Sequence, residues 1–290
     1  MKQKIFENFI HGIFLITGLI TIAAVLVISG YLVISGLPAI SEIGLINFLF
    51  GKEWKPTGTN PSYGILPFIL TSIYGTCGAI ILGAPIAILS AVFLAKVAPK
   101  KIKVFFVSGI SLLAGIPSVF YGLVGMLVLV PFVRDIFNLS DGASLFSAII
   151  VLSIMIYPSI VKISLDALDA VPMEYEEASL ALGATKIETF FRVSIPAAKS
   201  GITASVVLGV GRAIGEAMAV MMVSGNVANM PNLFESVRFL TTAVASEMSY
   251  ASGLQRQALF SIALVLFVFI MLINASLNLF MKKDKKENNK

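Results

Sequence analysis

Six long apolar stretches limit what this chain can fold into more than any other feature of its sequence. Each is close to or above the length of about 20 residues that an α-helix needs to cross ~30 Å of hydrocarbon. The stretches are continuously apolar rather than alternating, which indicates helices and not the strands of a membrane barrel. We therefore predict an all-α membrane protein with six transmembrane helices, at about 9–34, 65–95, 104–133, 143–161, 201–223 and 258–280.

The composition agrees with a chain that lies mostly in contact with lipid. Of its 290 residues, 57% are hydrophobic and 13% are charged, whereas a soluble domain carries about 25% charged residues. The net charge of +5 does not indicate nucleic-acid binding, because the positive residues gather at the ends of the apolar stretches. The single cysteine, Cys77, and the single histidine, His11, lie in different predicted spans. We therefore predict no internal disulfide, no metal site and no cofactor bound by this chain.

The distribution of lysine and arginine predicts that both termini are cytoplasmic. With the N-terminus inside, the inner segments hold fifteen of these residues and the outer loops hold five, which is the bias that the positive-inside rule describes. The stretch at 9–34 is too long for the core of a signal peptide, and no small-residue cleavage site follows it, so we expect it to be retained as a helix.

These signals divide the chain into three parts. Residues 1–63 hold the first span and an extracytoplasmic loop, residues 64–282 hold the main transmembrane domain, and residues 283–290 form a basic cytoplasmic tail. The tail is expected to lie near anionic lipid. Within this domain, an inner loop at about 171–196 carries residues that mark the start and end of a helix and a spaced motif.

A short helix is predicted within this inner loop. Pro172 suits the first turn of a helix, the three glutamates that follow it suit the helix dipole, and Gly183 is a plausible stop. The helix would have about ten residues, which is too short to cross a bilayer. It either docks as a rigid knob into a groove on a soluble partner or lies at the membrane interface as an amphipathic helix.

The predicted span at 201–223 carries two charged residues, Arg212 and Glu216. An arginine at the middle of a span costs roughly 2.5–3.5 kcal/mol, and a pair four residues apart on one helix face regains only about 0.2–0.5 kcal/mol. Two interpretations stay open: an ion pair that fixes helix packing, or a substrate path whose planar guanidinium binds a tetrahedral oxyanion. In the second, Gly209, Gly211 and Gly215 remove side-chain bulk and leave room for a ligand or another helix. Glu216 then pairs with Arg212 when the site is empty, or accepts a hydrogen bond from a protonated anion.

A helix break is predicted at residues 115–118, where the sequence Gly-Ile-Pro-Ser interrupts an apolar stretch. Glycine and proline free backbone groups inside a span, and this is tolerated where the backbone lines a cavity or packs on protein. Ser118 is therefore a candidate pathway residue, and a simple helix kink is the alternative.

A spaced pattern begins at Glu177-Ala178-Ser179, continues with Gly183 after three residues and ends with Val-Ser-Ile-Pro196 after nine more. It resembles the EAA loop of ABC import permeases, in which Glu-Ala-Ala, Gly and Ile-x-Leu-Pro have the same spacing. The resemblance implies a coupling helix that contacts an ATPase through Glu177, Ala178, Gly183 and Pro196. The chain has no Gly-x-x-x-x-Gly-Lys-Ser/Thr motif. We therefore expect a separate subunit to use ATP and Mg²⁺, and this chain not to be an enzyme.

Four further stretches, at 51–56, 64–69, 115–123 and 211–220, are similar to the PstC family of phosphate permease subunits. One departure is Ala217, where the family typically has threonine, so one hydroxyl is missing. The resemblance implies the type I ABC importer permease fold with a cytoplasmic coupling helix. It also implies a translocation pathway for inorganic phosphate that includes Arg212, Glu216, Gly211, Gly215 and Ser118.

The same resemblance implies the partners and the location of the chain. A second permease subunit (PstA-like) would complete the pore, a dimer of ATPase subunits (PstB-like) would drive it, and a phosphate-binding protein (PstS-like) would deliver the substrate. The complex would lie in the lipid bilayer of a bacterial inner (cytoplasmic) membrane and bind no nucleic acid.

Other interpretations remain. A type I permease for sulfate, molybdate or amino acids would share the fold, and competition of uptake by those solutes would distinguish it. A secondary transporter is expected to have inverted repeats, and we find no such symmetry in the sequence. An intramembrane enzyme needs a nucleophile beside a base or a metal cluster, and Cys77 and His11 stand alone. A membrane scaffold would leave Arg212 without a purpose.

Overall fold

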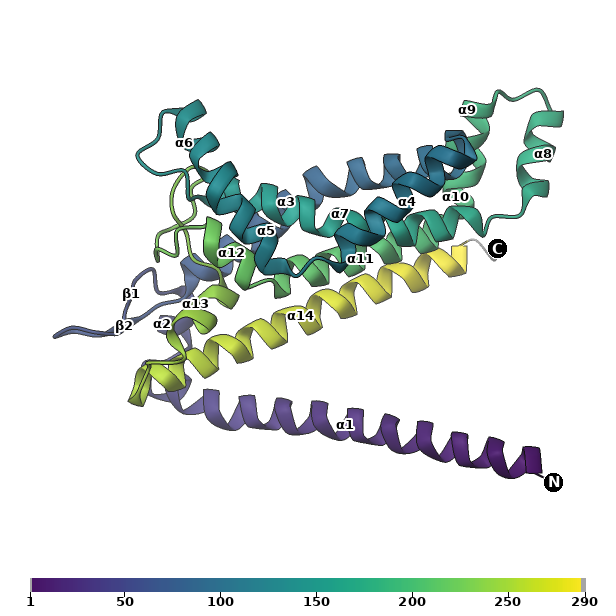
Figure 1. The fold of residues 1–290 in the computed structure, drawn as a ribbon. Helices are drawn as coiled ribbons and strands as arrows, with labels where there is room; N and C mark the ends of the chain where they lie inside the picture. Colours follow the sequence, from purple (N-terminus) through teal and green to yellow (C-terminus); the bar gives the residue numbers. More distant parts are fainter. Residues whose placement is uncertain (1, 288–290) are drawn as a thin grey trace.

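The computed structural model describes the backbone of residues 2–287 and the side chains of residue 7 and residues 9–276. Within these residues the fold is almost entirely helical, with one short antiparallel hairpin (Figure 1). The elements, in chain order, are α1 (Lys2–Ile43), α2 (Leu45–Phe50), β1 (Trp54–Lys55), β2 (Ser62–Tyr63), α3 (Leu66–Val92), the π-helical turn η1 (Phe93–Val97), α4 (Lys100–Gly115), α5 (Ser118–Val124), the π-helical turn η2 (Gly125–Leu129), α6 (Val130–Phe137), α7 (Leu145–Asp169), α8 (Met173–Ala181), α9 (Lys186–Thr189), the π-helical turn η3 (Phe190–Ser194), α10 (Ile195–Ala197), α11 (Lys199–Gly215), α12 (Met218–Val223), α13 (Leu240–Glu247) and α14 (Gly253–Glu287).

The described residues include five helical segments that are long and apolar enough to cross a membrane. A sixth is formed by α11 with the turns that precede it, which meet it at an angle of 70°. The five are Phe9–Ile43, Leu66–Val97, Ser118–Phe137, Leu145–Asp169 and Gly253–Ser276. The prediction of an all-α membrane protein is therefore confirmed.

The prediction of a single span at 104–133 is wrong. The chain forms α4 up to Gly115 and then begins α5 at Ser118, and only the second part continues far enough to cross a membrane. The predicted end of the fourth span at 161 is too early, because α7 continues to Asp169. Leu165 and Leu168 stay buried against the bundle there, so packing extends the helix past the purely apolar stretch.

The helix α7 lies at the centre of the bundle, packed between α3 and α11 (Figure 1). Two glycines let the backbone of α3 come close to it. A side chain at Gly78 would overlap Ile149, and one at Gly83 would lie 3.1 Å from the carbonyl oxygen of Ser153. Close backbone approach at small residues is how helices associate where lipid replaces water. The bundle therefore has a rigid centre against which the other spans are placed.

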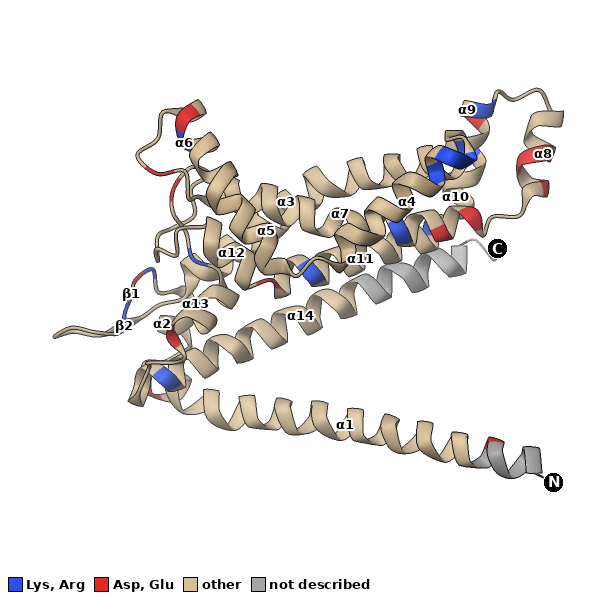
Figure 2. Cartoon of the chain, in the orientation of Figure 1, with Lys and Arg blue, Asp and Glu red and all other residues tan. Residues whose placement is uncertain are grey.

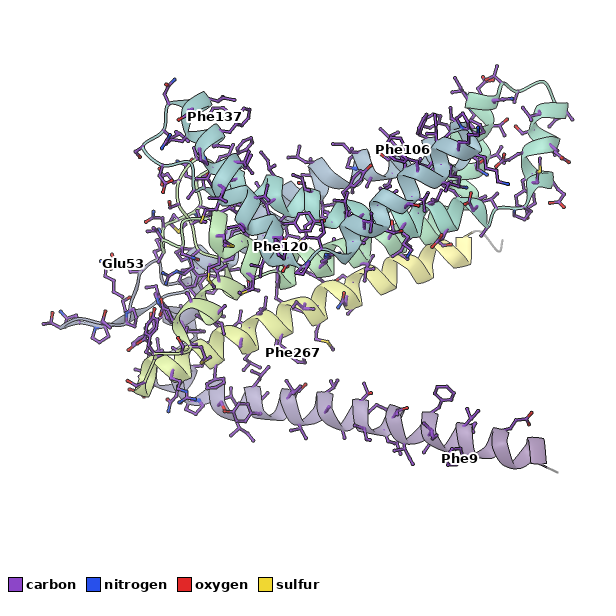
Figure 3. The ribbon with its side chains drawn as sticks, viewed as in Figure 1. Phe9, Glu53, Phe106, Phe120, Phe137 and Phe267 are labelled. Atoms are coloured by element: carbon purple, nitrogen blue, oxygen red, sulfur yellow. The ribbon has the colours of Figure 1, made fainter. Side chains whose placement is uncertain are left out.

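The first helix stands apart from the bundle. It touches α14 where the backbone of Gly36 meets Ser261, whose hydroxyl donates to the Gly36 carbonyl. From this contact α1 and α14 diverge (Figure 1), and side chains project from α1 on all sides (Figure 3). Phe14 and Ile34 are 72% and 74% exposed. Such a surface is stable in contact with lipid or with another apolar helix.

Charged residues gather at the two ends of the bundle (Figure 2). One end carries α8, α9 and the start of α4, and α1 begins and α14 ends at this same end (Figure 1). The opposite end carries the β1–β2 hairpin and α13. We call the first the α8 end and the second the hairpin end. Counting the bent pair as one span gives six crossings, which agrees with both ends of the described chain lying at the α8 end.

Candidate functional site

Arg212 lies in the last turn of α11, in the half of that helix farther from α8. Its side chain is half-buried, and its Nη1 donates to the hydroxyl of Ser159 on α7 at 2.8 Å. Among the side chains that the structure describes, no carboxylate forms an ion pair with it. A guanidinium has five N–H donors, so one hydrogen bond to a neutral group leaves both its charge and most of its donors available.

The sequence predicted that Glu216 lies on the same helix face as Arg212, and this prediction is wrong. α11 ends at Gly215, and the backbone of Glu216 is extended, with φ −72° and ψ 127°. The Glu216 carboxylate instead accepts a hydrogen bond from the N–H of Ala219 at 2.9 Å, in the first turn of α12. Its carbonyl oxygen accepts from the hydroxyl of Thr241, 25 residues later, at 2.7 Å. The predicted pairing of Arg212 with Glu216 in the empty site is therefore wrong.

Two helices, α4 and α11, end in the same way. α4 ends at Gly115 and α11 ends at Gly215, and the next residue in each case is extended. Ile116 has φ −70° and ψ 127°, almost the same values as Glu216. A new short helix begins two residues after each of these, and Ser118 starts the first of them. The predicted break is thus present, and a second one accompanies it.

The short helices after the two breaks, α5 and α12, pack on each other. A side chain at Gly122 would lie 2.7 Å from the Cα of Ala219, so only glycine permits this approach. Across the first break, the Tyr121 hydroxyl donates to the carbonyl oxygen of Leu113 at 2.7 Å. The two breaks therefore lie in one region of the bundle, beside the end of α11 that carries Arg212.

Gly211 and Gly215 have open space beside them, whereas Gly209, for which the sequence predicted the same, does not. A side chain at Gly209 would overlap Ile160 of α7, so that glycine serves packing within the chain. A side chain at Gly211 or Gly215 would meet no described atom within 4 Å. The open space that the sequence predicted beside Arg212 is present on this part of α11.

The predicted coupling segment forms a separate helix at the α8 end. α8 has nine residues, begins directly after Pro172 and is followed by Gly183, whose φ of +90° favours glycine. Glu177 and Ala178 are exposed, and Leu182 is 90% exposed. The helix therefore presents a free outer face to whatever lies beyond the membrane on this side.

The turn after α8 is held by a capping box. The backbone N–H and the hydroxyl of Thr185 both donate to the Glu188 carboxylate at 2.9 Å. Both hydrogen bonds lower the pKa of the Glu188 carboxyl, and the backbone hydrogen bond has the larger effect. The chain then passes through η3 and α10, which contains Pro196, and bends by 70° into α11. Pro196 thus lies just before the helix α11 of the fifth predicted span.

A polar cluster at the hairpin end was not predicted. The carboxylate of Glu247, 5% exposed, pairs with Arg238 and accepts from Trp54 Nε1 at 3.2 Å and from Gln255 Nε2 at 2.9 Å. Trp54 lies 193 residues from Glu247, while Arg238 and Gln255 lie 9 and 8 residues from it, and no local motif joins the four. We call them the Glu247 cluster. A polar cavity of about 670 Å³ opens beside it.

The fold has long apolar helices packed around the central α7, two helices that end at glycines near the middle of the bundle, and a short polar helix outside it (Figure 1). These features define a membrane permease of the type I ABC importer class. Solved structures share this fold. A chain of a bacterial alginate ABC transporter aligns with a TM-score of 0.62 at 18% identity, covering 94% of both chains. A chain of the MetNI methionine ABC transporter aligns with a TM-score of 0.56 at 18% identity, covering 76% of this chain and 94% of that one.

The chain belongs to the family of binding-protein-dependent transport system inner membrane components, whose model matches residues 83–283. The probable ABC transporter permease protein YqgH of Bacillus subtilis is 42% identical over 235 residues, 79% of this chain and 76% of that protein. The phosphate transport system permease protein PstC of Pasteurella multocida is 34% identical over 265 residues, 84% of this chain and 82% of that protein. The chain is therefore a membrane permease subunit of an ABC importer and not an enzyme.

Proposed function

We propose that this chain forms the translocation pathway for inorganic phosphate, and that Arg212 binds the anion during transport. The observation that carries the proposal is the half-buried guanidinium, which among the described residues donates to the neutral hydroxyl of Ser159 and forms no ion pair. Keeping such a charge in a span costs several kcal/mol, and no ion pair with a described residue offsets this cost. A ligand with two or more negative oxygens would offset it, because the planar fork can donate to two oxygens at once.

The two breaks and the glycines beside Arg212 support a pathway rather than a packing role. Irregular backbone within a span is tolerated where it lines a cavity or is buried in protein. Ser118 begins the helix after one break, and Gly211 and Gly215 leave the surface of α11 open near the other. We infer that the anion passes along this surface, between this chain and a second, PstA-like permease subunit.

Glu216 is proposed to select for a protonated anion. Its carboxylate is fixed on the N–H of Ala219 rather than on Arg212. A carboxylate near the path repels an anion but accepts a hydrogen bond from a phosphate that carries a proton. Sulfate carries no proton near neutral pH, so this contact favours phosphate over sulfate.

The outer face of α8 is proposed to dock on a PstB-like ATPase subunit that uses ATP and Mg²⁺. Glu177, Ala178 and Gly183 lie on or next to the exposed side of this helix, and Pro196 lies where the loop returns to the membrane. On this proposal α8 and both termini are cytoplasmic, in a bacterial inner membrane. A PstS-like binding protein then delivers phosphate at the hairpin end.

The test is uptake of radioactive phosphate into liposomes that contain the whole complex, with ATP supplied to the ATPase side. We expect ATP-dependent uptake by the wild type and near-complete loss with Arg212→Ala. Arg134→Ala is the matched control, because Arg134 is exposed and pairs with its neighbour Asp135. Normal uptake by Arg212→Ala, or uptake that sulfate or molybdate suppresses more strongly than unlabelled phosphate does, would contradict the proposal.

A further inference from the structure

Glu176 faces the membrane spans, unlike the other two glutamates of α8. Glu174 and Glu177 are exposed, whereas the Glu176 side chain is 17% exposed. Its Oε1 pairs with the ammonium of Lys96, which is 12% exposed, and accepts a hydrogen bond from the hydroxyl of Ser194 at 2.8 Å. Because both partners are largely shielded from water, solvent screens this pair less than a surface pair.

The three residues come from three parts of the transport machinery. Lys96 lies in η1, which continues α3 at its α8 end. Ser194 lies in η3, which leads through α10 into α11, the helix that carries Arg212. Both partners lie in π-helical turns, which are rare and frequent at functional sites. One carboxylate oxygen therefore connects α8 with two of the spans.

A second contact on the same side of α8 fixes its rotation. Ser179, three residues after Glu176, shares a helix face with it, and its hydroxyl lies 3.0 Å from the hydroxyl of the buried Thr189. The opposite side, with Glu177 and Ala178, stays exposed. One side of α8 is thus bound to the spans while the other is free for a partner.

We propose that Lys96, Glu176 and Ser194 form a clamp that makes α8 move together with α3 and α11. This rests on the transport function proposed above. When the ATPase displaces α8, a closed clamp passes the displacement to both spans and so to the region of Arg212. With the clamp open, α8 moves without them, and ATP is hydrolysed with little transport. Glu176 is thus a positioning residue for coupling.

The test measures phosphate uptake and ATP hydrolysis in the same liposomes and takes their ratio. Glu176→Ala removes the acceptor of both contacts, and we expect the ratio to fall at least about fivefold while hydrolysis continues, since one change breaks two shielded interactions. Asp169→Asn is the matched control. It breaks the pair of Asp169 with Lys103 at the same end of the bundle, which is more exposed and does not involve α8.

The exchange Lys96→Glu with Glu176→Lys separates coupling from folding. It restores an ion pair, and the Ser194 hydroxyl accepts from an ammonium as readily as it donates to a carboxylate. We expect the exchange to recover most of the ratio that each single change loses. An unchanged ratio in Glu176→Ala, or no recovery in a stably folded exchange variant, would overturn the clamp. Absence of uptake by the wild-type complex would instead overturn the transport proposal.

Discussion

Two half-buried arginines of this chain have opposite surroundings. Arg238, at the hairpin end, pairs with Glu247, donates from Nε to the carbonyl oxygen of Asn226 at 2.8 Å and lies 5.9 Å from the centre of the Phe68 ring. Arg212, within α11, donates to the neutral hydroxyl of Ser159. A charge that its own chain neutralises stabilises the fold, whereas a charge left with a neutral partner is available to a ligand.

The comparison predicts opposite effects when each arginine is disturbed. Changes in the Glu247 cluster should lower stability, and transport only through stability. Changes around Arg212 should lower transport and leave stability nearly unaltered. A variant can lose transport only because it unfolds. Each variant is therefore measured both for thermal unfolding in detergent and for phosphate uptake.

The largest effect is expected for Glu247→Ala. It leaves the charge of Arg238, whose side chain is 17% exposed, without its partner, and breaking a largely shielded pair in this way costs up to about 3–5 kcal/mol. It also removes the acceptor of Trp54 and Gln255. Thermal unfolding of the purified chain measures the loss. Glu53→Ala is the control, since the Glu53 carboxylate is 65% exposed and forms a surface pair with Lys55, worth about 0–1 kcal/mol.

Equal unfolding temperatures for Glu247→Ala and Glu53→Ala would remove the contrast between the two arginines. The Glu247 cluster would then be no more structural than a surface pair. Its polar cavity would become the better candidate for a ligand.

The next effect is expected for Arg212→Lys. The charge is kept, but an ammonium cannot offer two parallel donors to one anion. We expect uptake efficiency to fall about ten- to a hundredfold, or ~1.4–2.8 kcal/mol of lost recognition. Thermal stability should stay close to that of the wild type, because Lys can still donate to Ser159. Full uptake by this variant would show that the anion is attracted by charge alone.

The spans and the coupling helix were predictable because their signals are local. An apolar stretch specifies a membrane helix wherever it lies in the sequence, and Pro172 and Gly183 mark the ends of α8 from within it. The break after Gly115 was predictable for the same reason, since Pro117 disfavours helical backbone at the residue before it.

The break after Gly215 was not predictable from local sequence. No proline follows it, and the helix end is stabilised by Thr241, which donates to the carbonyl oxygen of Glu216 from 25 residues away. A helix that continued past Gly215 would have placed Glu216 on the same face as Arg212, and the prediction was wrong because the helix ends there. Ser159 was missed because a serine within an apolar helix is common, and only the packing of α7 against α11 brings it to Arg212.

A smaller effect is expected for Glu216→Gln. The amide oxygen can still accept from the Ala219 N–H, so the helix start should be kept, and the negative charge is lost. We expect phosphate uptake to fall about threefold to tenfold, near 1 kcal/mol, with a smaller preference for phosphate over sulfate. Competition of uptake by sulfate measures the preference. If the preference and the uptake rate both equal those of the wild type, Glu216 serves only to start α12.

The smallest effect, and the sharpest use of the comparison, is expected for Ser159→Ala. If Ser159 only orients the guanidinium, its loss should weaken phosphate uptake about twofold to threefold, because a hydrogen bond at the weak end of the usual range contributes about 0.5 kcal/mol. Ser153→Ala is the matched control on the same helix, since its hydroxyl donates to backbone carbonyls and does not contact Arg212. A loss of uptake as large as that of Arg212→Lys would mean that Ser159 binds the anion itself. Both residues would then have to be counted as ligands, and Arg212 would no longer act as a single anion-binding group.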